Sequence, residues 1–292
     1  MKYKRMALAA CALLLLLSAT NLSAVLTDEH PRYHQHLERP AYTPCAEHDG
    51  ETRVARLMTE AKLAVEDRRF DDAAESLAEL QVGGQRHIAA LRLALRTAQA
   101  KGDWGEAVRV VRQLVKVKAL TPELAEPVKR RAHQEGLKQR TGDALAINTY
   151  WQDVPRDEQR DPRLVASLAR ALIAAGDGSG AQKAIETQLA LGWDTTLAGI
   201  YGRCEGGEVR SRLAKAEDWL TRNPRDPQLL LTLGRLCVQS QLWGKAESYL
   251  EASLAIEPGW EAHVELAHLA ERINRTDDAN RHYRAAAELS RR

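Results

Sequence analysis

A small residue recurs through most of this sequence at intervals close to 34 residues. Segments such as "GKAESYL", "DDAAESL" and "GEAVRVV" align with one another around an alanine. The aligned alanines are separated by 34, 37, 37, 35, 30 and 33 residues and are Ala73, Ala107, Ala144, Ala181, Ala216, Ala246 and Ala279. A period of this length is typical of stacked helical hairpins, in which each repeat covers the apolar face of its neighbour.

A second small or apolar residue precedes each of these alanines by twelve positions. This set is Ala61, Leu95, Ala132, Ala169, Cys204, Gly234 and Ala267. Two antiparallel helices approach closely only where both carry small side chains, and larger residues then fill the space between hairpins. The pattern is that of tetratricopeptide repeats, and it predicts an all-α solenoid of about seven helical hairpins. The alternative is a generic helical bundle in which the alanine spacing is accidental.

Other residues mark where the helices of each repeat begin and end. Aromatic residues stand three positions before an alanine at Phe70, Trp104 and Trp243, the usual bulky position at the start of the second helix. Gly102 and Gly176 fall in the expected turns between helices, and Pro258 follows the expected end of a second helix. The repeat at 195–223 matches the pattern least well.

Composition supports helices and gives no sign of catalysis. Only 5% of the residues are aromatic and there is a single Phe, whereas sheets favour β-branched and aromatic residues. The sequence contains no GxSxG, HExxH, kinase or dinucleotide-binding signature, so we expect a protein that is not an enzyme. The four cysteines form no CxxC pair, and Cys204 and Cys237 are expected to be small, buried helix residues.

The first residues have the features of an export or anchoring signal. A basic flank, "MKYKR", is followed by the apolar run "MALAACALLLLL". Retained, residues 6–26 would just span a bilayer, with the repeats on the periplasmic side of a bacterial inner membrane. Cleaved after Ala24, the signal would release a soluble periplasmic protein. We therefore expect a signal or anchor over 1–27, a flexible linker over 28–52 and repeats over 53–292.

The first helix of each repeat is expected to present one side chain to a concave groove. That row reads Lys62, Arg96, His133, Arg170, Glu205, Arg235 and His268. A second row one turn earlier reads Met58, Arg92, Lys129, Ala166, Tyr201, Leu231 and Val264, so Arg92, Arg96, Lys129 and His133 are expected to lie close together. The predicted ligand-groove residues are Lys62, Arg92, Arg96, Lys129, His133, Arg170, Arg235 and His268. A basic groove suits an anionic ligand, such as an acidic peptide or the propionates of a tetrapyrrole. Alternatively, these residues are simply the solvated face of amphipathic helices.

Two other kinds of ligand are not expected. The linker holds His30, His34, His36, Cys45 and His48, but without regular spacing they do not predict a metal site. The net charge of +2 does not suggest nucleic acid, and an exported or membrane-tethered body would rarely meet it.

Four segments carry a family resemblance. "DPQLLLTLGRLCVQSQLWGKAESYLEASLAIEP", with "GDWGEAVRVVRQLVKVKAL", "ARLMTEAKLAVEDRRFDDAAESLAEL" and "AEDWLTRNPRDP", resembles the C-terminal half of the HemY family of bacterial inner-membrane tetratricopeptide proteins. The resemblance covers roughly residues 53–290 and is strongest over "LTLGRLC" and "LWGKAESYLEASL". Members of that family usually begin with a two-helix membrane hairpin, whereas this chain has one hydrophobic segment.

The resemblance implies a non-enzymatic, membrane-tethered scaffold that assists late haem or porphyrin biosynthesis or traffic. It would bind partner proteins, or a haem or porphyrin, in the basic groove. The competing interpretation is a periplasmic tetratricopeptide adaptor that assembles an envelope protein complex and has no role in haem metabolism.

Overall fold

The computed structural model describes residues 50–82 and 87–291. These residues form helices joined by turns and irregular segments, with no strand among them. They contain fourteen α-helices and one 3-10 helix. The described residues fall into two compact units, one that ends at Leu120 and one that begins at Thr121. We call them the N-terminal and C-terminal units.

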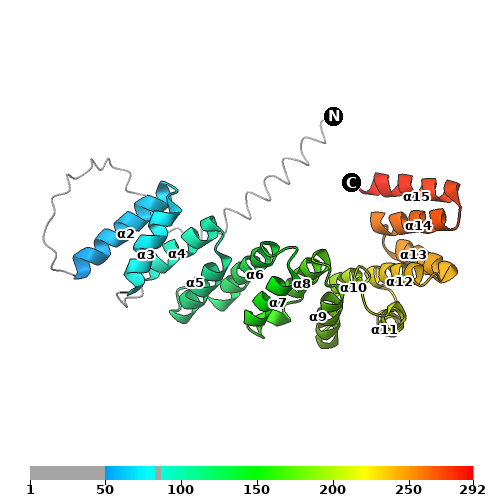
Figure 1. Cartoon of the computed structure of the whole chain (residues 1–292), viewed down its shortest axis with the longest axis horizontal. Helices are drawn as coiled ribbons and strands as arrows, with labels where there is room; N and C mark the ends of the chain where they lie inside the picture. Colours follow the sequence, from blue (N-terminus) through cyan, green and yellow to red (C-terminus); the bar gives the residue numbers. More distant parts are fainter. Residues whose placement is uncertain (1–49, 83–86, 292) are drawn as a thin grey trace. The chain divides into compact units, whose positions relative to one another are not determined.

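Seven hairpins of consecutive helices make up the described residues, as predicted (Figure 1). The N-terminal unit contains two hairpins, α2 (Gly50–Glu66) with α3 (Phe70–Val82) and α4 (Ile88–Lys101) with α5 (Trp104–Lys116). The C-terminal unit contains five, which are α6 (Pro122–Lys138) with α7 (Ala144–Asp153), α8 (Pro162–Ala174) with α9 (Gly178–Leu191), α10 (Thr195–Tyr201) with α11 (Val209–Arg222), α12 (Pro227–Gln239) with α13 (Trp243–Ile256), and α14 (Trp260–Arg272) with α15 (Thr276–Leu289). The 3-10 helix η1 (Glu158–Arg160) precedes α8.

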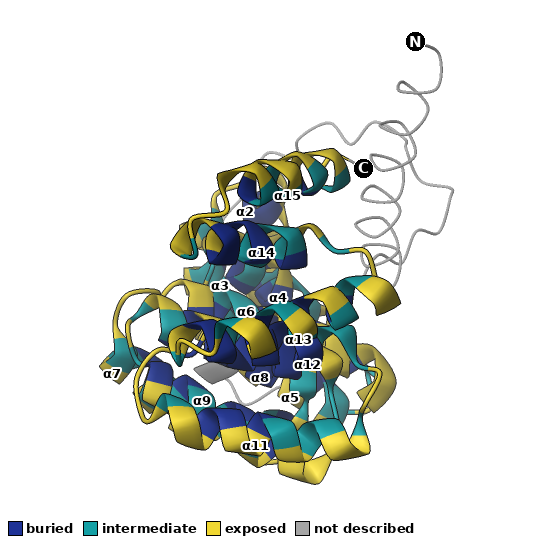
Figure 2. Cartoon of the chain, turned by 90° about the vertical axis from the view of Figure 1, so that its right-hand side faces the viewer, coloured by how far each residue is buried: buried dark blue, intermediate teal, exposed yellow. Residues whose placement is uncertain are grey.

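Within each unit the hairpins pack in a regular order. First helices contact one another, α2 with α4 in the N-terminal unit and α6, α8, α10, α12 and α14 in turn in the C-terminal unit. Second helices contact the first helix of the next hairpin, as α13 does with α14. The first helices therefore form one layer of the stack, and each helix buries one side and exposes the other (Figure 2). This is the packing of tetratricopeptide repeats.

The recurring small residues lie at the helix contacts, as predicted, with one correction. Six of the seven aligned alanines are at most 2% exposed. The exception is Ala144, which is only half-buried because it is the first residue of α7, whereas Ala107 and Ala181 are the fourth of theirs. Ile147, fully buried, occupies the equivalent position, so the alignment of this repeat was wrong by three residues.

The turns confirm the corrected alignment. Gly102 and Gly176 have φ values of 71° and 80° and lie five residues before Ala107 and Ala181. Gly142, with φ of 94°, lies five residues before Ile147. Left-handed backbone at this position is the common feature of these turns, and glycine adopts it without steric cost.

The weakly matching repeat at 195–223 departs from the pattern in its structure too. Its first helix, α10, has only seven residues. Cys204, which the alignment placed on this helix, follows it in the loop but is still fully buried. The buried guanidinium of Arg212 on α11 donates a hydrogen bond to the Cys204 carbonyl oxygen and so anchors the loop.

Both described cysteines should be chemically inert in the folded protein. Burial raises the pKa of the Cys204 thiol to about 12 and that of Cys237 to about 11, from an ordinary value of 9.0. Thiolate, the reactive form, is populated only as the pH rises through the pKa. At pH 8 we expect iodoacetamide to label both at least about a hundredfold more slowly than in urea, because two pKa units reduce the thiolate fraction about a hundredfold. Peptide mass spectrometry would measure each site, and rapid labelling of native Cys237 would contradict the prediction.

The predicted signal or anchor, residues 28–49 of the predicted linker and the linker histidines lie outside the described residues. Residues 50–52, which the sequence placed in the linker, are the first residues of α2. Among residues 50–82 and 87–291, no helix has the length and apolar character needed to span a bilayer. The predicted localisation therefore stays a prediction.

Candidate functional site

Three predicted groove residues lie on the first helices of the N-terminal unit. Lys62 on α2 and Arg96 on α4 are exposed, and Arg92 on α4 is half-buried. Lys62 and Arg96 form no ion pair with any described residue. Lys129 and His133 belong to the C-terminal unit, so a groove that joins them to Arg92 and Arg96 stays a prediction.

Lys129 and His133 on α6 form a buried polar network. Glu158 in η1 is 8% exposed and accepts a hydrogen bond from Lys129 Nζ at 3.0 Å. Its other carboxylate oxygen lies 2.8 Å from His133 Nε2, and His133 Nδ1 lies 2.8 Å from the Tyr150 hydroxyl of α7. Burial alone would lower the pKa of Lys129, but its hydrogen bonds to Glu126 and Glu158 outweigh this and raise the pKa. In this structure both basic groups hold α6, α7 and η1 together.

Arg170 and His268 remain at the surface of the C-terminal unit. Arg170 on α8 is exposed and forms no ion pair with a described residue. His268 on α14 is exposed, and its ring packs edge-on against Tyr283 of α15 at a centroid distance of 6.0 Å. Neither residue lines a described hollow.

Arg235 lies in a hollow on the first-helix layer of the C-terminal unit. It encloses about 440 Å³ between the end of α10, α12 and α14, and is lined by Gly202, Arg203, Glu205, Arg235, Val238, Gln239, Trp260, Glu261, Val264, Glu265 and Arg272. Glu205, Arg235 and Val264 are groove positions that the repeat pattern had predicted. A second hollow of about 490 Å³ lies next to it between α12 and α14 and shares Trp260 and Glu261. We call the two together the Trp260 groove.

The Trp260 groove carries both signs of charge, whereas the sequence predicted a mainly basic surface. Arg235 Nε donates to Glu265 at 2.7 Å, and its terminal nitrogen lies 3.4 Å from Glu261. Glu261 also pairs with Arg203, which lies two hairpins earlier, just after α10. Arginines and glutamates line the first hollow in equal number, three of each. An anionic ligand would have to compete with carboxylates already bound to Arg235.

The two rows predicted along the first helices did not include Trp260 and Glu261, which give this groove its exposed aromatic surface and part of its negative charge. Trp260, the first residue of α14, is 47% exposed although it is large and apolar. It and Glu261 lie one helical turn before the row that contains Val264, so the alignment did not include them. The available signal was "EPGW", a helix stop followed at once by an aromatic residue at the next helix start.

The groove suits a partner that is recognised through apolar contacts, hydrogen bonds and ion pairs. An exposed indole offers apolar area with a hydrogen-bond donor, and the paired charges offer both donors and acceptors. Among the described residues no group of three or more His, Cys, Asp or Glu is placed to hold a metal ion.

Comparison with known proteins gives distant structural likenesses only. No family model and no curated protein matches the sequence. Among solved structures, the human IFIT1 dimer with PPP-AAAA aligns with a TM-score of 0.40 at 14% sequence identity. The alignment covers 78% of this chain and 58% of that one, so this chain spans less than two thirds of that protein's length.

Proposed function

We propose that this protein is a non-enzymatic helical-repeat scaffold that binds a partner protein in the Trp260 groove. The observation that supports this most is the pair of adjacent hollows that share an exposed Trp260. Together they form a continuous surface that crosses α12 and α14, because both are lined by Trp260 and Glu261. An extended peptide segment fits such a surface better than a compact ligand does.

The chemistry of the groove indicates the kind of segment. Aromatic residues at the centre of an interface contribute much of the binding energy, because they bury a large rigid surface. Trp260 would therefore pack against an apolar side chain of the partner. Charged side chains also line the groove and would form ion pairs with acidic and basic residues of the partner. These side chains are Arg203, Glu261 and Arg272. Such pairs favour specificity more than affinity.

The proposal predicts that binding depends on Trp260. Peptides selected from a random library on the immobilised full-length protein should lose at least about tenfold in affinity for Trp260→Ala, since a central aromatic typically contributes 2 kcal/mol or more. Leu191→Ala is the matched control, because Leu191 is 65% exposed on α9 and lines neither hollow. Isothermal titration calorimetry would measure both variants. Equal affinities of Trp260→Ala and the unaltered protein would exclude the groove as the binding site.

A membrane-tethered, HemY-like role in haem or porphyrin traffic is the second candidate. The observation in its favour is the N-terminal unit, where Lys62 and Arg96 are exposed on contacting first helices without an acidic partner among the described residues. Stoichiometric binding of haemin to the full-length protein, weakened by Arg92→Glu with Arg96→Glu, would favour this role. Peptide binding without haemin binding would favour a protein adaptor.

A further inference from the structure

The last hairpin departs from the repeat pattern at one packing position. This position lies four residues before the small or apolar contact residue of each first helix, and in the six earlier repeats it holds an aliphatic residue that is at most 8% exposed. Those residues are Leu57, Leu91, Val128, Val165, Ile200 and Leu230. The seventh repeat has His263 of α14 there. An imidazole is a poor replacement for a buried aliphatic side chain, because its nitrogens need polar partners.

The partner of His263 is a second histidine. Nδ1 of His263 lies 3.1 Å from Nδ1 of His282 on α15, and the two rings are tilted by 36° with their centroids 5.3 Å apart. No described carboxylate forms an ion pair with either ring, and no described residue bonds to either Nε2 atom. His133 differs, because its Nε2 atom lies on Glu158. The His263–His282 pair therefore places two nitrogen donors side by side between α14 and α15.

The spacing of the two Nδ1 atoms suits one divalent transition-metal ion. Zinc binds imidazole nitrogen at 2.0–2.1 Å, so two nitrogens on one tetrahedral zinc ion lie about 3.3 Å apart. The observed 3.1 Å is close to this value, and rotation of each ring about its Cβ–Cγ bond turns both lone pairs toward a common point. Both side chains are half-buried, so solvent reaches the pair. Imidazole suits Zn²⁺ and Cu²⁺, whereas Mg²⁺ and Ca²⁺ prefer oxygen ligands.

We propose that His263 and His282 bind one divalent transition-metal ion, Zn²⁺ or Cu²⁺, through their Nδ1 atoms and so hold α14 against α15. Water fills the remaining coordination positions, because no third His, Cys, Asp or Glu among the described residues is placed to join the pair. Neither histidine lines the Trp260 groove, so the site does not depend on the function proposed above. We expect a dissociation constant on the order of 10 µM, since two protein ligands replace the four of a structural zinc site.

Metal binding changes where one proton of the pair resides. In the neutral pair one Nδ1 carries a proton and donates it to the other, because a neutral imidazole has one N–H and one acceptor nitrogen. When the metal binds, that ring loses its Nδ1 proton to water and gains one at Nε2. Both Nδ1 atoms are then ligands, both rings stay neutral, and no net proton is released.

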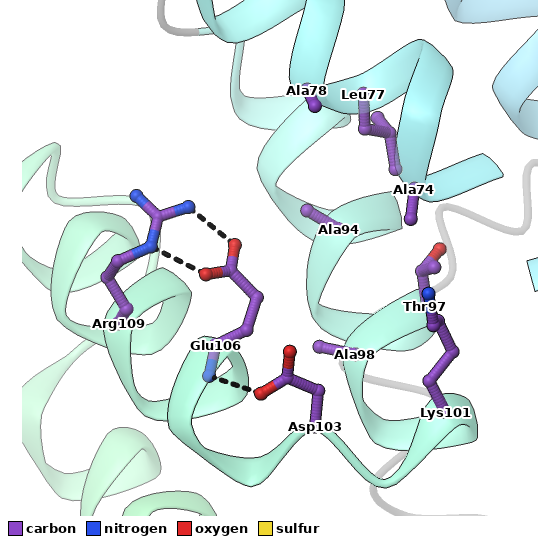
Figure 3. Close-up of a pocket in the computed structure, with 10 residues that line it drawn as sticks. All are labelled: Ala74, Leu77, Ala78, Ala94, Thr97, Ala98, Lys101, Asp103, Glu106 and Arg109. Atoms are coloured by element: carbon purple, nitrogen blue, oxygen red, sulfur yellow. Dashed lines mark hydrogen bonds and ion pairs between the residues drawn. The ribbon is translucent and has the colours of Figure 1, made fainter. Parts of the chain in front are cut away.

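The acidic hollow of the N-terminal unit is not expected to compete for the ion. It encloses about 290 Å³ between α3, α4 and α5, and neither histidine nor cysteine is among its lining residues. Figure 3 shows the Glu106 carboxylate bonded to Arg109, and Asp103 bonded to the Glu106 backbone N–H. Both carboxylates are thus already engaged within the start of α5. The linker histidines, outside the described residues, are a second possible source of zinc binding, so the test has to be specific to His263 and His282.

Histidine-ring NMR of the full-length protein provides that specificity. In protein with ¹⁵N-labelled histidine, long-range ¹H–¹⁵N spectra distinguish a protonated ring nitrogen from one that binds a metal, and the signals are assigned from His263→Leu. Without metal, one of the two Nδ1 atoms should be protonated. Saturating Zn²⁺ should make both Nδ1 atoms metal-bound and both Nε2 atoms protonated, and Mg²⁺ should change neither. Zinc bound by other histidines while these Nδ1 signals stay unchanged would show a hydrogen-bonded pair only and overturn the proposal.

A stability measurement tests whether the ion holds the hairpin together. Zn²⁺ at about 1 mM, roughly a hundred times the expected dissociation constant, should raise the urea midpoint of the C-terminal unit, because a ligand of the folded state stabilises it. His263→Leu should fold, since Leu57, Leu91 and Leu230 occupy this position in other repeats, and its midpoint should not respond to zinc. His268→Leu is the matched control, because His268 is exposed on the same helix and its ring contacts Tyr283 rather than a histidine. It should respond as the unaltered protein does. An equal response of His263→Leu and the unaltered protein would refute the site.

Discussion

Replacing Gly178 by alanine is expected to lower the free energy of unfolding of the C-terminal unit by about 3 kcal/mol. Gly178 begins α9, and a β-carbon there would overlap the carbonyl oxygen of Glu205 and lie 2.5 Å from its carbonyl carbon. Overpacking usually costs 1–3 kcal/mol, and here the obstacle is backbone, which cannot rotate away as a side chain can. The loop after α10 would have to move, and its hydrogen bond from Arg212 would be strained.

Urea unfolding followed by tryptophan fluorescence would measure this effect. Five of the six tryptophans, all but Trp104, lie in the C-terminal unit, so the signal reports mainly on that unit. Gly244→Ala is the matched control, because Gly244 lies in the first turn of α13 in the same unit and a β-carbon there would meet no atom within 4 Å. It should be neutral or stabilising by up to about 1 kcal/mol. An unchanged midpoint for Gly178→Ala would show that the loop does not pack on α9.

Glu158→Ala should also cost about 3 kcal/mol. Glu158 is the shared carboxylate of Lys129 and His133, and all three side chains are at most 12% exposed. Removing one member of a buried ion pair leaves the other charge without its partner and typically costs 3–5 kcal/mol. We expect the low end of that range, because Lys129 keeps Glu126 at 2.6 Å.

An exposed ion pair of the same unit is the reference for this variant. Glu247 pairs with Arg275, but both side chains are more than a third exposed, so solvent screens the interaction. Glu247→Ala should therefore change the stability by less than about 1 kcal/mol, measured in the same urea titration. If the two variants had equal effects, the network around Glu158 would contribute no more than a surface pair does.

Much of the fold followed from local pattern alone. Two helices approach most closely where both carry small residues, so the seven hairpins and most of their alignment could be predicted from alanine spacing. The error at Ala144 has a physical cause, because large Ile147 fills the position that a small residue fills elsewhere. The pattern at 144 was matched by residue type, whereas packing depends on distance from the helix start.

The charge of the candidate site could not be predicted in the same way. The first-helix rows correctly placed Arg235, Glu205 and Val264 at one hollow. They did not include Glu261 and Glu265, which come from the neighbouring hairpin and neutralise Arg235. Salt bridges between repeats depend on where side chains of different helices meet, and a one-dimensional row contains no such information.

The sequence by itself determined the helical hairpins, because hydrophobic period, turn glycines and small contact residues act over a few residues of chain. Only the tertiary structure decided which charges remain available to a ligand, since Lys129, Arg130 and Arg235 each pair with a carboxylate 26 to 31 residues away in the chain. The tertiary structure also explains why Gly178 occupies the helix start at which three other repeats carry Phe70, Trp104 or Trp243. The backbone at Glu205 occupies that space, and only a residue without a side chain leaves room for it.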